Sequence, residues 1–139
     1  GDFAKTMLRQ VFVDCWLELV WAAFAGHDDE VVRGVAAKAA KENAYHRRHS
    51  RAWVVRLGDG TEESRRRMLL ALDELWPLTA EIAVSGWREA ITDVLVEATV
   101  PVPAAAPRDE AAIAGCAAAR RELLEEMQSL ARAHPGATW

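Results

Sequence analysis

Residues 29–57, DEVVRGVAAKAAKENAYHRRHSRAWVVRL, form the stretch that decides the fold. This stretch contains no proline and only one glycine, Gly34, so about eight helical turns can run through it without a break. Such a helix exceeds the usual globular length and is typical of long antiparallel pairs in helical bundles. On one side Gly26 suits a helix C-cap, and on the other the segment 58–61, GDGT, is a turn.

A second long helix is predicted at the start of the chain, over residues 3–25. Its apolar residues recur at steps of three and four, and they occupy more than one helical face. They are Met7, Leu8, Val11, Phe12, Cys15, Trp16, Leu19, Val20 and Ala23. A helix that is apolar on several faces belongs in the interior of a bundle, so we expect this helix to be central.

The rest of the chain also favours helices, and no segment has the alternation of a strand. We predict helices over 61–83, 85–99 and 109–133, with Pro77 kinking or restarting the first of them. Three prolines in residues 100–107 predict an extended linker. The sequence therefore predicts one all-α domain that covers the whole chain.

Composition and charge exclude several classes of protein. The chain has 139 residues, of which 51% are hydrophobic and 27% charged, as in one globular domain. Its net charge of −4 disfavours nucleic acid as the main partner. No apolar run approaches the roughly 18 residues of a membrane span, and from the opening Gly1-Asp2-Phe3 we expect no signal peptide. Cys15 and Cys116 lie far apart in helical surroundings, which favours a reducing compartment and a cytoplasmic location.

Acidic side chains within apolar helices are the most informative feature. Asp14 and Glu18 lie four residues apart, so they share a helical face that is otherwise apolar. An unpaired buried carboxylate would cost several kcal/mol, so these groups need donors, a metal ion or water. Glu42, His46 and His49 lie within two turns of the second long helix. Carboxylates and imidazoles that converge from facing helices are the ligands of di-iron sites in helical bundles.

The spacing argues against an intact di-iron site. The di-iron pattern is Glu-x-x-His, but Tyr45 stands three residues after Glu42 and His46 stands four after it. We therefore expect no bound metal, with Asp14 and Glu42 making buried salt bridges or hydrogen bonds. Glu18 and His46 are the remaining candidate ligands. Gly-rich phosphate loops, Gly-x-Ser-x-Gly, Cys-x-x-Cys and zinc-ligand spacings are all missing from the sequence.

A basic region lies around the long hairpin and consists of Arg47, Arg48, His49, Arg51, Arg56, Arg65, Arg66 and Arg67. One interpretation is a solvated face, supported by Glu62–Arg66 and Glu63–Arg67 pairs at helical spacing. The other is a docking surface for an acidic partner or a phosphate-bearing ligand, because arginines beside aromatic residues are common at interfaces. The interface candidates are Arg48, Trp53, Arg56 and Arg66.

Several contiguous motifs resemble the family of C-type subunits of phenylacetyl-CoA epoxidases. They extend over nearly the whole chain but correspond to the later part of such subunits. In chain order they are Gly1-Asp2-Phe3-Ala4, Arg9-Gln10, Ala36-Ala37-Lys38-Ala39-Ala40-Lys41-Glu42, Tyr45-His46-x-Arg48-x-Ser50-x-x-Trp53, Arg56-Leu57-Gly58-Asp59-Gly60-Thr61-Glu62-Glu63-Ser64, Leu75-Trp76, Leu124-x-Glu126-Met127-Gln128-x-Leu130 and Pro135-Gly136-x-x-Trp139.

The resemblance implies a ferritin-like bundle in a multicomponent oxygenase of aerobic phenylacetate breakdown. In that family a separate, catalytic subunit holds the di-iron centre, and the C-type subunit is a related, non-catalytic bundle that pairs with it. Carried over to this chain, Asp14 and Glu42 occupy the carboxylate positions of the third and fourth helices, and Tyr45 stands in the place of the lost histidine. We therefore expect this chain to hold no cofactor and its catalytic partner to hold the di-iron centre.

The family's first two bundle helices have no counterpart in this sequence, so the fold we expect is the second half of a ferritin-like bundle. Apolar helix faces cannot stay in water, which predicts self-association that rebuilds four helices or an N-terminal part outside this sequence. Two alternatives to a structural epoxidase subunit remain. One is a shortened ferritin-like protein that binds metal between subunits of a homo-oligomer through Asp14, Glu18, Glu42 and His46. The other is a degraded family member that only self-associates.

Overall fold

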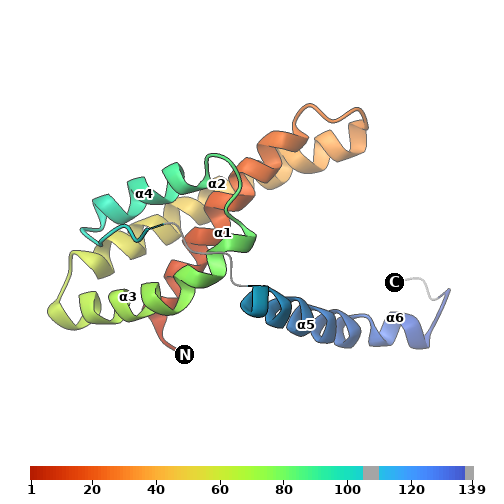
Figure 1. The fold of residues 1–139 in the computed structure, drawn as a ribbon. Coiled ribbons are helices and arrows are strands. Elements are labelled where there is room, and N and C mark those ends of the chain that lie inside the picture. The colour runs from red at the N-terminus through yellow and green to blue at the C-terminus, as the bar shows by residue number, and fades with distance from the viewer. Residues whose placement is uncertain (105–109, 137–139) are drawn as a thin grey trace. The chain divides into compact units, whose positions relative to one another are not determined.

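The computed structural model describes residues 1–104 and 110–136, and this part of the chain is helical without a strand (Figure 1). The all-α prediction is confirmed. Its elements in chain order are α1 (Phe3–Phe24), α2 (Glu30–Gly58), α3 (Glu62–Leu75), the 3₁₀ helix η1 (Trp76–Glu81), α4 (Trp87–Glu97), α5 (Glu110–Met127) and α6 (Ser129–Ala133).

Two compact units make up the chain, Gly1–Pro107 and Arg108–Trp139. The prediction of a single ferritin-like domain over all 139 residues stays a prediction. No helix in the described ranges is both long enough and apolar enough to cross a lipid bilayer.

A hairpin of the two long helices, α1 and α2, is the frame of the first unit (Figure 1). Both helices begin at an aspartate whose side chain accepts backbone N–H bonds that would otherwise be unsatisfied. Asp2 accepts from Ala4 N at 2.8 Å, and Asp29 accepts from Val31 N at 2.8 Å. The long uninterrupted helix that the sequence predicts is therefore confirmed, displaced by one residue at each end.

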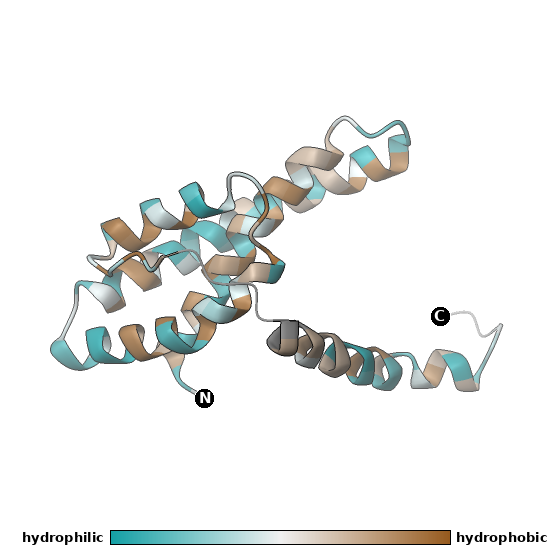
Figure 2. Ribbon diagram, viewed as in Figure 1, coloured by the Kyte–Doolittle hydropathy of each residue, from teal (hydrophilic) through white to brown (hydrophobic). Residues whose placement is uncertain are grey.

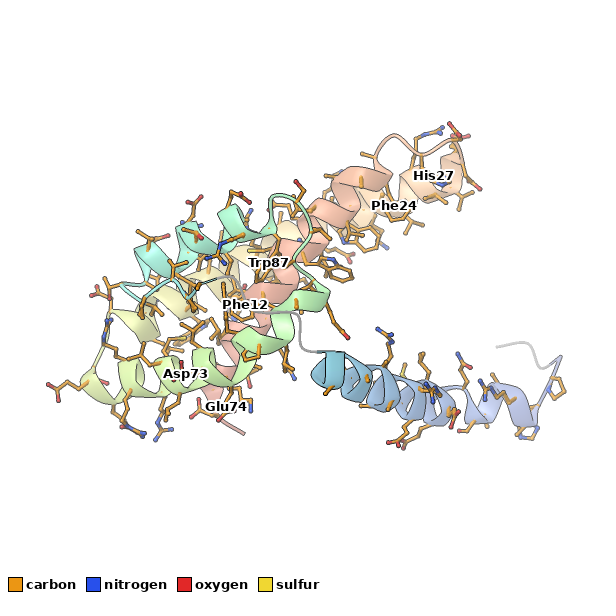
Figure 3. The ribbon with its side chains drawn as sticks, in the orientation of Figure 1. Phe12, Phe24, His27, Asp73, Glu74 and Trp87 are labelled. Carbon is orange, nitrogen blue, oxygen red and sulfur yellow. The ribbon has the colours of Figure 1, made fainter. Side chains whose placement is uncertain are left out.

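The core lies where α3 and α4 pack against the hairpin. Its centre is aromatic: Phe12 contacts the rings of Trp76 and Trp87 edge to face, with centroids 5.9 and 5.6 Å apart (Figure 3). The indole Nε1 of Trp87 donates to the carbonyl oxygen of Phe12 at 2.9 Å, which satisfies the polar atom of a buried ring. The fully buried apolar side chains around these rings are Leu8, Val11, Cys15, Val54, Met68, Ile91, Val94 and Leu95.

Pro77 ends the third helix, so the prediction of one helix over 61–83 is wrong in its length. The α-helix stops at Leu75, and a 3₁₀ helix with Pro77 in its first turn continues to Glu81. The restart that Pro77 predicts is confirmed, because proline lacks the N–H of the α-helical bond. The helix predicted over 85–99 is shorter than expected, since α4 begins at Trp87 and ends at Glu97, so Ser85 does not cap it. Gly86, with φ of 86°, precedes α4 instead, in a left-handed conformation that glycine adopts without strain.

The ends of α2 and α4 meet at Gly58. A Cβ atom at this glycine would lie 2.3 Å from the carbonyl oxygen of Ala98, so no side chain fits here without a backbone shift. Arg65 bridges the same two ends, because its Nη1 donates to the carbonyl oxygen of Gly58 at 3.2 Å and to Thr99 Oγ1 at 2.9 Å. The turn at residues 58–61 therefore fixes how closely α4 approaches α2.

The second unit consists of α5 and α6. None of the side chains that the structure describes there is buried. The predicted helix over 109–133 is divided, since α5 ends at Met127 and α6 begins at Ser129. At the division Ser129 Oγ donates to the carbonyl oxygen of Glu126 at 2.7 Å, a local bond that competes with helix continuation.

Two valines of α4 test the placement of the core. Val94 is fully buried, whereas Val96 is 63% exposed on another face of the same helix. We expect Val94→Ala to lower the free energy of unfolding by about 2 kcal/mol, because it removes two buried methyl groups and leaves a cavity. Val96→Ala is the matched control and should change that free energy by less than about 0.5 kcal/mol. Urea denaturation followed by circular dichroism measures both, and equal effects would contradict this core.

Candidate functional site

An open groove of about 330 Å³ runs between α1 and α2. It gathers three of the residues that the sequence singles out, Asp14, Glu42 and His46. The other lining residues are Gln10, Leu17 and Trp21 of α1 and Ala39 and Asn43 of α2. Carboxylates and an imidazole from the two facing helices therefore meet in one groove, as their positions in the sequence predict.

Asp14 lies at the bottom of this groove and is 1% exposed. Its two carboxylate oxygens accept separate hydrogen bonds, from Gln10 Nε2 at 2.8 Å and from Ser50 Oγ at 2.6 Å. Asn43 Nδ2 donates to the backbone carbonyl oxygen of Asp14 at 2.9 Å. Because Asn43 and Ser50 belong to α2, these bonds join the two long helices in the interior. The buried carboxylate is thus held by protein donors, as one of the two sequence-based interpretations expects.

The three donors to Asp14 were not identified from the sequence, although a signal exists. Gln10 precedes Asp14 by four residues, so it lies one turn away on the same face. Asn43 and Ser50 are seven apart, which is two turns along a face of α2 that is otherwise buried. Polar residues at such spacing within a buried face indicate a partner across the helix pair.

Glu42 and Tyr45 are exposed, and among the described residues no ion-pair partner of Glu42 is found, so the expectation of a buried pairing is wrong for Glu42. Tyr45 is 61% exposed and does not line the groove. The guanidinium of Arg48 lies over its ring, 5.4 Å from the centroid. A tyrosine that stands three residues after Glu42 therefore faces solvent in this unit, while His46, at four residues, lies in the groove.

Glu18 is engaged outside the groove, in an ion pair with Arg47 that joins α1 to α2. Cys15 lies beside this pair. Burial raises the pKa of the Cys15 thiol, and the nearby Arg47 partly opposes that effect. Burial also disfavours the charged form of Arg47, but the contacts with Cys15 and Glu18 outweigh it and raise the Arg47 pKa. This cluster stabilises the hairpin, so the role of Glu18 in this unit is to join the two helices.

The donor set does not fit a di-iron centre. In the described part of the chain, no three His, Cys, Asp or Glu side chains converge as they must to hold a metal ion. Asp14 already accepts one protein hydrogen bond on each oxygen, and Tyr45 faces away. The prediction that this chain holds no iron is not tested by this geometry and stays a prediction.

Apolar side chains line a hollow at the tip of the hairpin. It is formed by Trp21, Phe24, Val31, Val32 and Val35. Val31 is 73% exposed and Val35 is 56% exposed, although both belong to a long helix. In Figure 2 brown and tan ribbon is interspersed with teal on this end of α1 and α2, and Figure 3 places Phe24 next to His27 there. The exposed apolar faces that the sequence predicts are therefore present.

The four interface candidates differ in their surroundings. Arg48 lies over Tyr45, and Arg56 lies over Trp53 at 5.4 Å from the ring centroid. Arg66 pairs with Glu63 at 2.8 Å, not with Glu62 as the spacing predicts. Arg67 also binds Glu63, and the hydrogen bonds from the two arginines lower the pKa of Glu63 to about 2.

Comparison with known proteins places this hairpin in a family. A family model described as "Phenylacetic acid catabolic protein" matches residues 1–86, which include α1 and α2. The C-type subunit of the 1,2-phenylacetyl-CoA epoxidase of Escherichia coli (strain K12) is 33% identical over 165 aligned positions. The alignment takes in 100% of this chain and 65% of that protein. The chain thus spans somewhat less than two thirds of the length of the curated relative.

The hydrogen bond from Ser50 to Asp14 gives a direct test of the groove. We expect Ser50→Ala to lower the free energy of unfolding by about 2 kcal/mol, because one oxygen of a buried carboxylate loses its donor. Ser85→Ala, at an exposed turn position, is the control and should change stability by less than about 0.5 kcal/mol. In the background of Asp14→Ala, the additional loss from Ser50→Ala should be much smaller. Additive losses in urea denaturation would contradict this pairing.

Proposed function

The chain belongs to the phenylacetic acid catabolic protein family, and we propose that it is a non-catalytic structural subunit of a multicomponent phenylacetyl-CoA epoxidase. It pairs with a catalytic subunit that holds a di-iron centre, and it supports that subunit without reacting with substrate itself. The similarity to an epoxidase subunit over the whole chain supports the assignment to this class of assembly.

The single observation that carries the non-catalytic role is the occupied state of Asp14. In a metal centre this carboxylate would have to turn its oxygens toward the ion. Here each oxygen accepts a bond from a neighbouring side chain, and breaking the bond to Ser50 would leave polar groups unsatisfied in the interior. Asp14 therefore joins α1 to α2. This favours a structural subunit in which the polar residues of the groove stabilise the helix pair.

The exposed apolar tip of the hairpin supports association with other polypeptide chains. An apolar surface of this kind gains free energy when a partner covers it. We propose that this chain also self-associates through the groove side of the hairpin and its apolar tip, so that two pairs of long helices complete a four-helix arrangement. Self-association and pairing with the catalytic subunit are separate contacts, and each has its own experiment.

Co-purification tests the main proposal. The catalytic subunit from the same organism, bearing an affinity tag, is co-expressed with this untagged chain, and both are purified at moderate ionic strength. We expect the two to elute together in a fixed ratio. Iron, measured by atomic emission, should follow the amount of catalytic subunit. Recovery of the catalytic subunit alone would contradict the pairing, and iron bound in stoichiometric amount to this chain purified alone would favour the metal-binding alternative.

Light scattering coupled to size-exclusion chromatography tests self-association. We expect this chain, purified alone, to elute as a dimer or a larger species, because the apolar tip needs cover. Val31→Lys together with Val35→Lys, at two exposed positions of the tip, should shift the chain toward the monomer. A well-folded monomer of the unaltered chain, with the helical circular dichroism spectrum of the fold above, would refute this proposal.

A further inference from the structure

One surface of α2 is basic along most of the helix and differs from the groove. Four cations at helical spacing, Lys38, Lys41, Arg48 and Arg56, are exposed, and Tyr45 lies among them. The steps between these five residues are three, four, three and eight, so all five lie on one side of the helix. That side is opposite the residues of α2 that are buried against the rest of the unit, such as Ala36 and Val54. We call these five residues, together with Trp53 on their edge, the basic face of α2.

The cations of the basic face are not neutralised within the described part of the chain. Five cations in the described part of the first unit have carboxylate partners, while others, such as Arg33, Arg65 and Arg88, donate to backbone carbonyl oxygens. Lys5 pairs with Glu74, Arg51 with Glu97, and Arg67 with Glu63. No ion pair of this kind involves the four cations of the basic face within residues 1–104 and 110–136. Glu42, four residues after Lys38, lies at the groove edge of this face without an ion pair to any of the four cations, so the face keeps an excess of positive charge although the whole chain has a net charge of −4.

Two aromatic rings position the arginines of this face. Arg48 lies over the ring of Tyr45 and Arg56 over the ring of Trp53, each at 5.4 Å from the centroid. Trp53 is fixed in turn by Phe3, whose ring meets it edge to face at 5.1 Å. A guanidinium that rests on a ring keeps its N–H donors free for a carboxylate and loses less conformational freedom when it binds one. Arginine and aromatic side chains in this arrangement are enriched at protein interfaces.

The shape of the basic face decides the class of partner. From Lys38 to Arg56 it extends for about 27 Å along one helix, whereas a single phosphate group needs donors that converge on a point. A row of charges of this length fits the carboxylates on one side of a partner helix. We propose that the basic face of α2 is the surface through which this chain docks on an acidic helix face of the catalytic subunit. This inference rests on the proposed function and names the surface and the charge of the partner that it requires.

Arg66, the fourth interface candidate, is left out of this surface because Glu63 occupies its guanidinium through two bonds, of 2.8 and 2.9 Å. Lys38, Lys41 and Tyr45 take its place. The apolar tip of the hairpin, by contrast, serves the contact between copies of this chain. The two contacts differ in chemistry, so salt separates them: ionic strength weakens the charged contact and leaves the apolar one largely unchanged.

Charge reversal tests the proposal. The catalytic subunit is immobilised, and binding of this chain is followed by biolayer interferometry at about 0.05 M and 0.5 M salt, across which screening changes strongly. The variant carries Arg48→Glu and Arg56→Glu. The control carries Arg120→Glu and Arg121→Glu, two exposed positions of α5 with the same change in charge. At low salt we expect the first variant to bind at least about tenfold more weakly, mainly through slower association, and the control to bind as the unaltered chain does.

The binding results separate failure of this inference from failure of the proposed function. If the unaltered chain binds and the reversed variant binds equally well, the basic face is not the docking surface, while the proposed pairing stands. If the unaltered chain does not bind the immobilised subunit, the proposed pairing is wrong and this inference with it.

Coenzyme A binding, a milder substitution and circular dichroism separate the remaining outcomes. If calorimetric titration shows that the reversal abolishes binding of coenzyme A while the affinity for the catalytic subunit is unchanged, a phosphate-binding role replaces the one proposed here. A second variant, Arg48→Gln with Arg56→Gln, should show an intermediate loss of affinity if the contact is electrostatic. Circular dichroism of both variants must match that of the unaltered chain.

Discussion

The carboxylate of Asp14 is buried between the two long helices and must have a hydrogen-bond donor for each oxygen. Gln10 supplies one donor from the same helix and Ser50 supplies the other from the facing helix, while Asn43 binds the backbone of Asp14. Because two of these three donors come from α2, their bonds set the register of α2 against α1. The groove beside Asp14 depends on that register, since α1 and α2 both supply its lining residues.

The same constraint connects the fold to the proposed role. A bundle interior that holds metal ions keeps its carboxylates free to coordinate, and it supports them with donors outside the metal centre. In this hairpin the donors bind the carboxylate itself, so the polar interior stabilises the helix pair. The remaining polar residues of the groove, Glu42 and His46, are exposed in the first unit, and the surface that keeps an excess of positive charge lies on another side of α2. Stability and partner binding are thus assigned to different faces of one helix.

Much of this arrangement could be predicted from the sequence. The absence of proline from residues 29–57 and the apolar steps of residues 3–25 predict the long hairpin, because local periodicity decides helix formation in such segments. Pro77 predicts an interruption, although not the 3₁₀ helix that follows it. The two donors from α2, Asn43 and Ser50, could not be paired with Asp14 from the sequence because side chains 29 and 36 residues apart meet only after the hairpin has formed. The orientation of Tyr45 could not be predicted either, since helical spacing alone does not decide which of two neighbouring residues, Tyr45 or His46, enters the groove.

Gly58 has a consequence for how this family can change over time. Since a Cβ atom there would lie 2.3 Å from the carbonyl oxygen of Ala98, any substitution must move the end of α4 away from α2. Arg65 would then lose one of the two oxygens that it bridges, Gly58 O or Thr99 Oγ1, so three positions at the ends of different helices are tied to one another. A homologue that lacks the glycine should therefore also differ at the arginine and in the loop after α4. Covariation of these three positions among relatives is a signature of this helix crossing that needs no structure to detect.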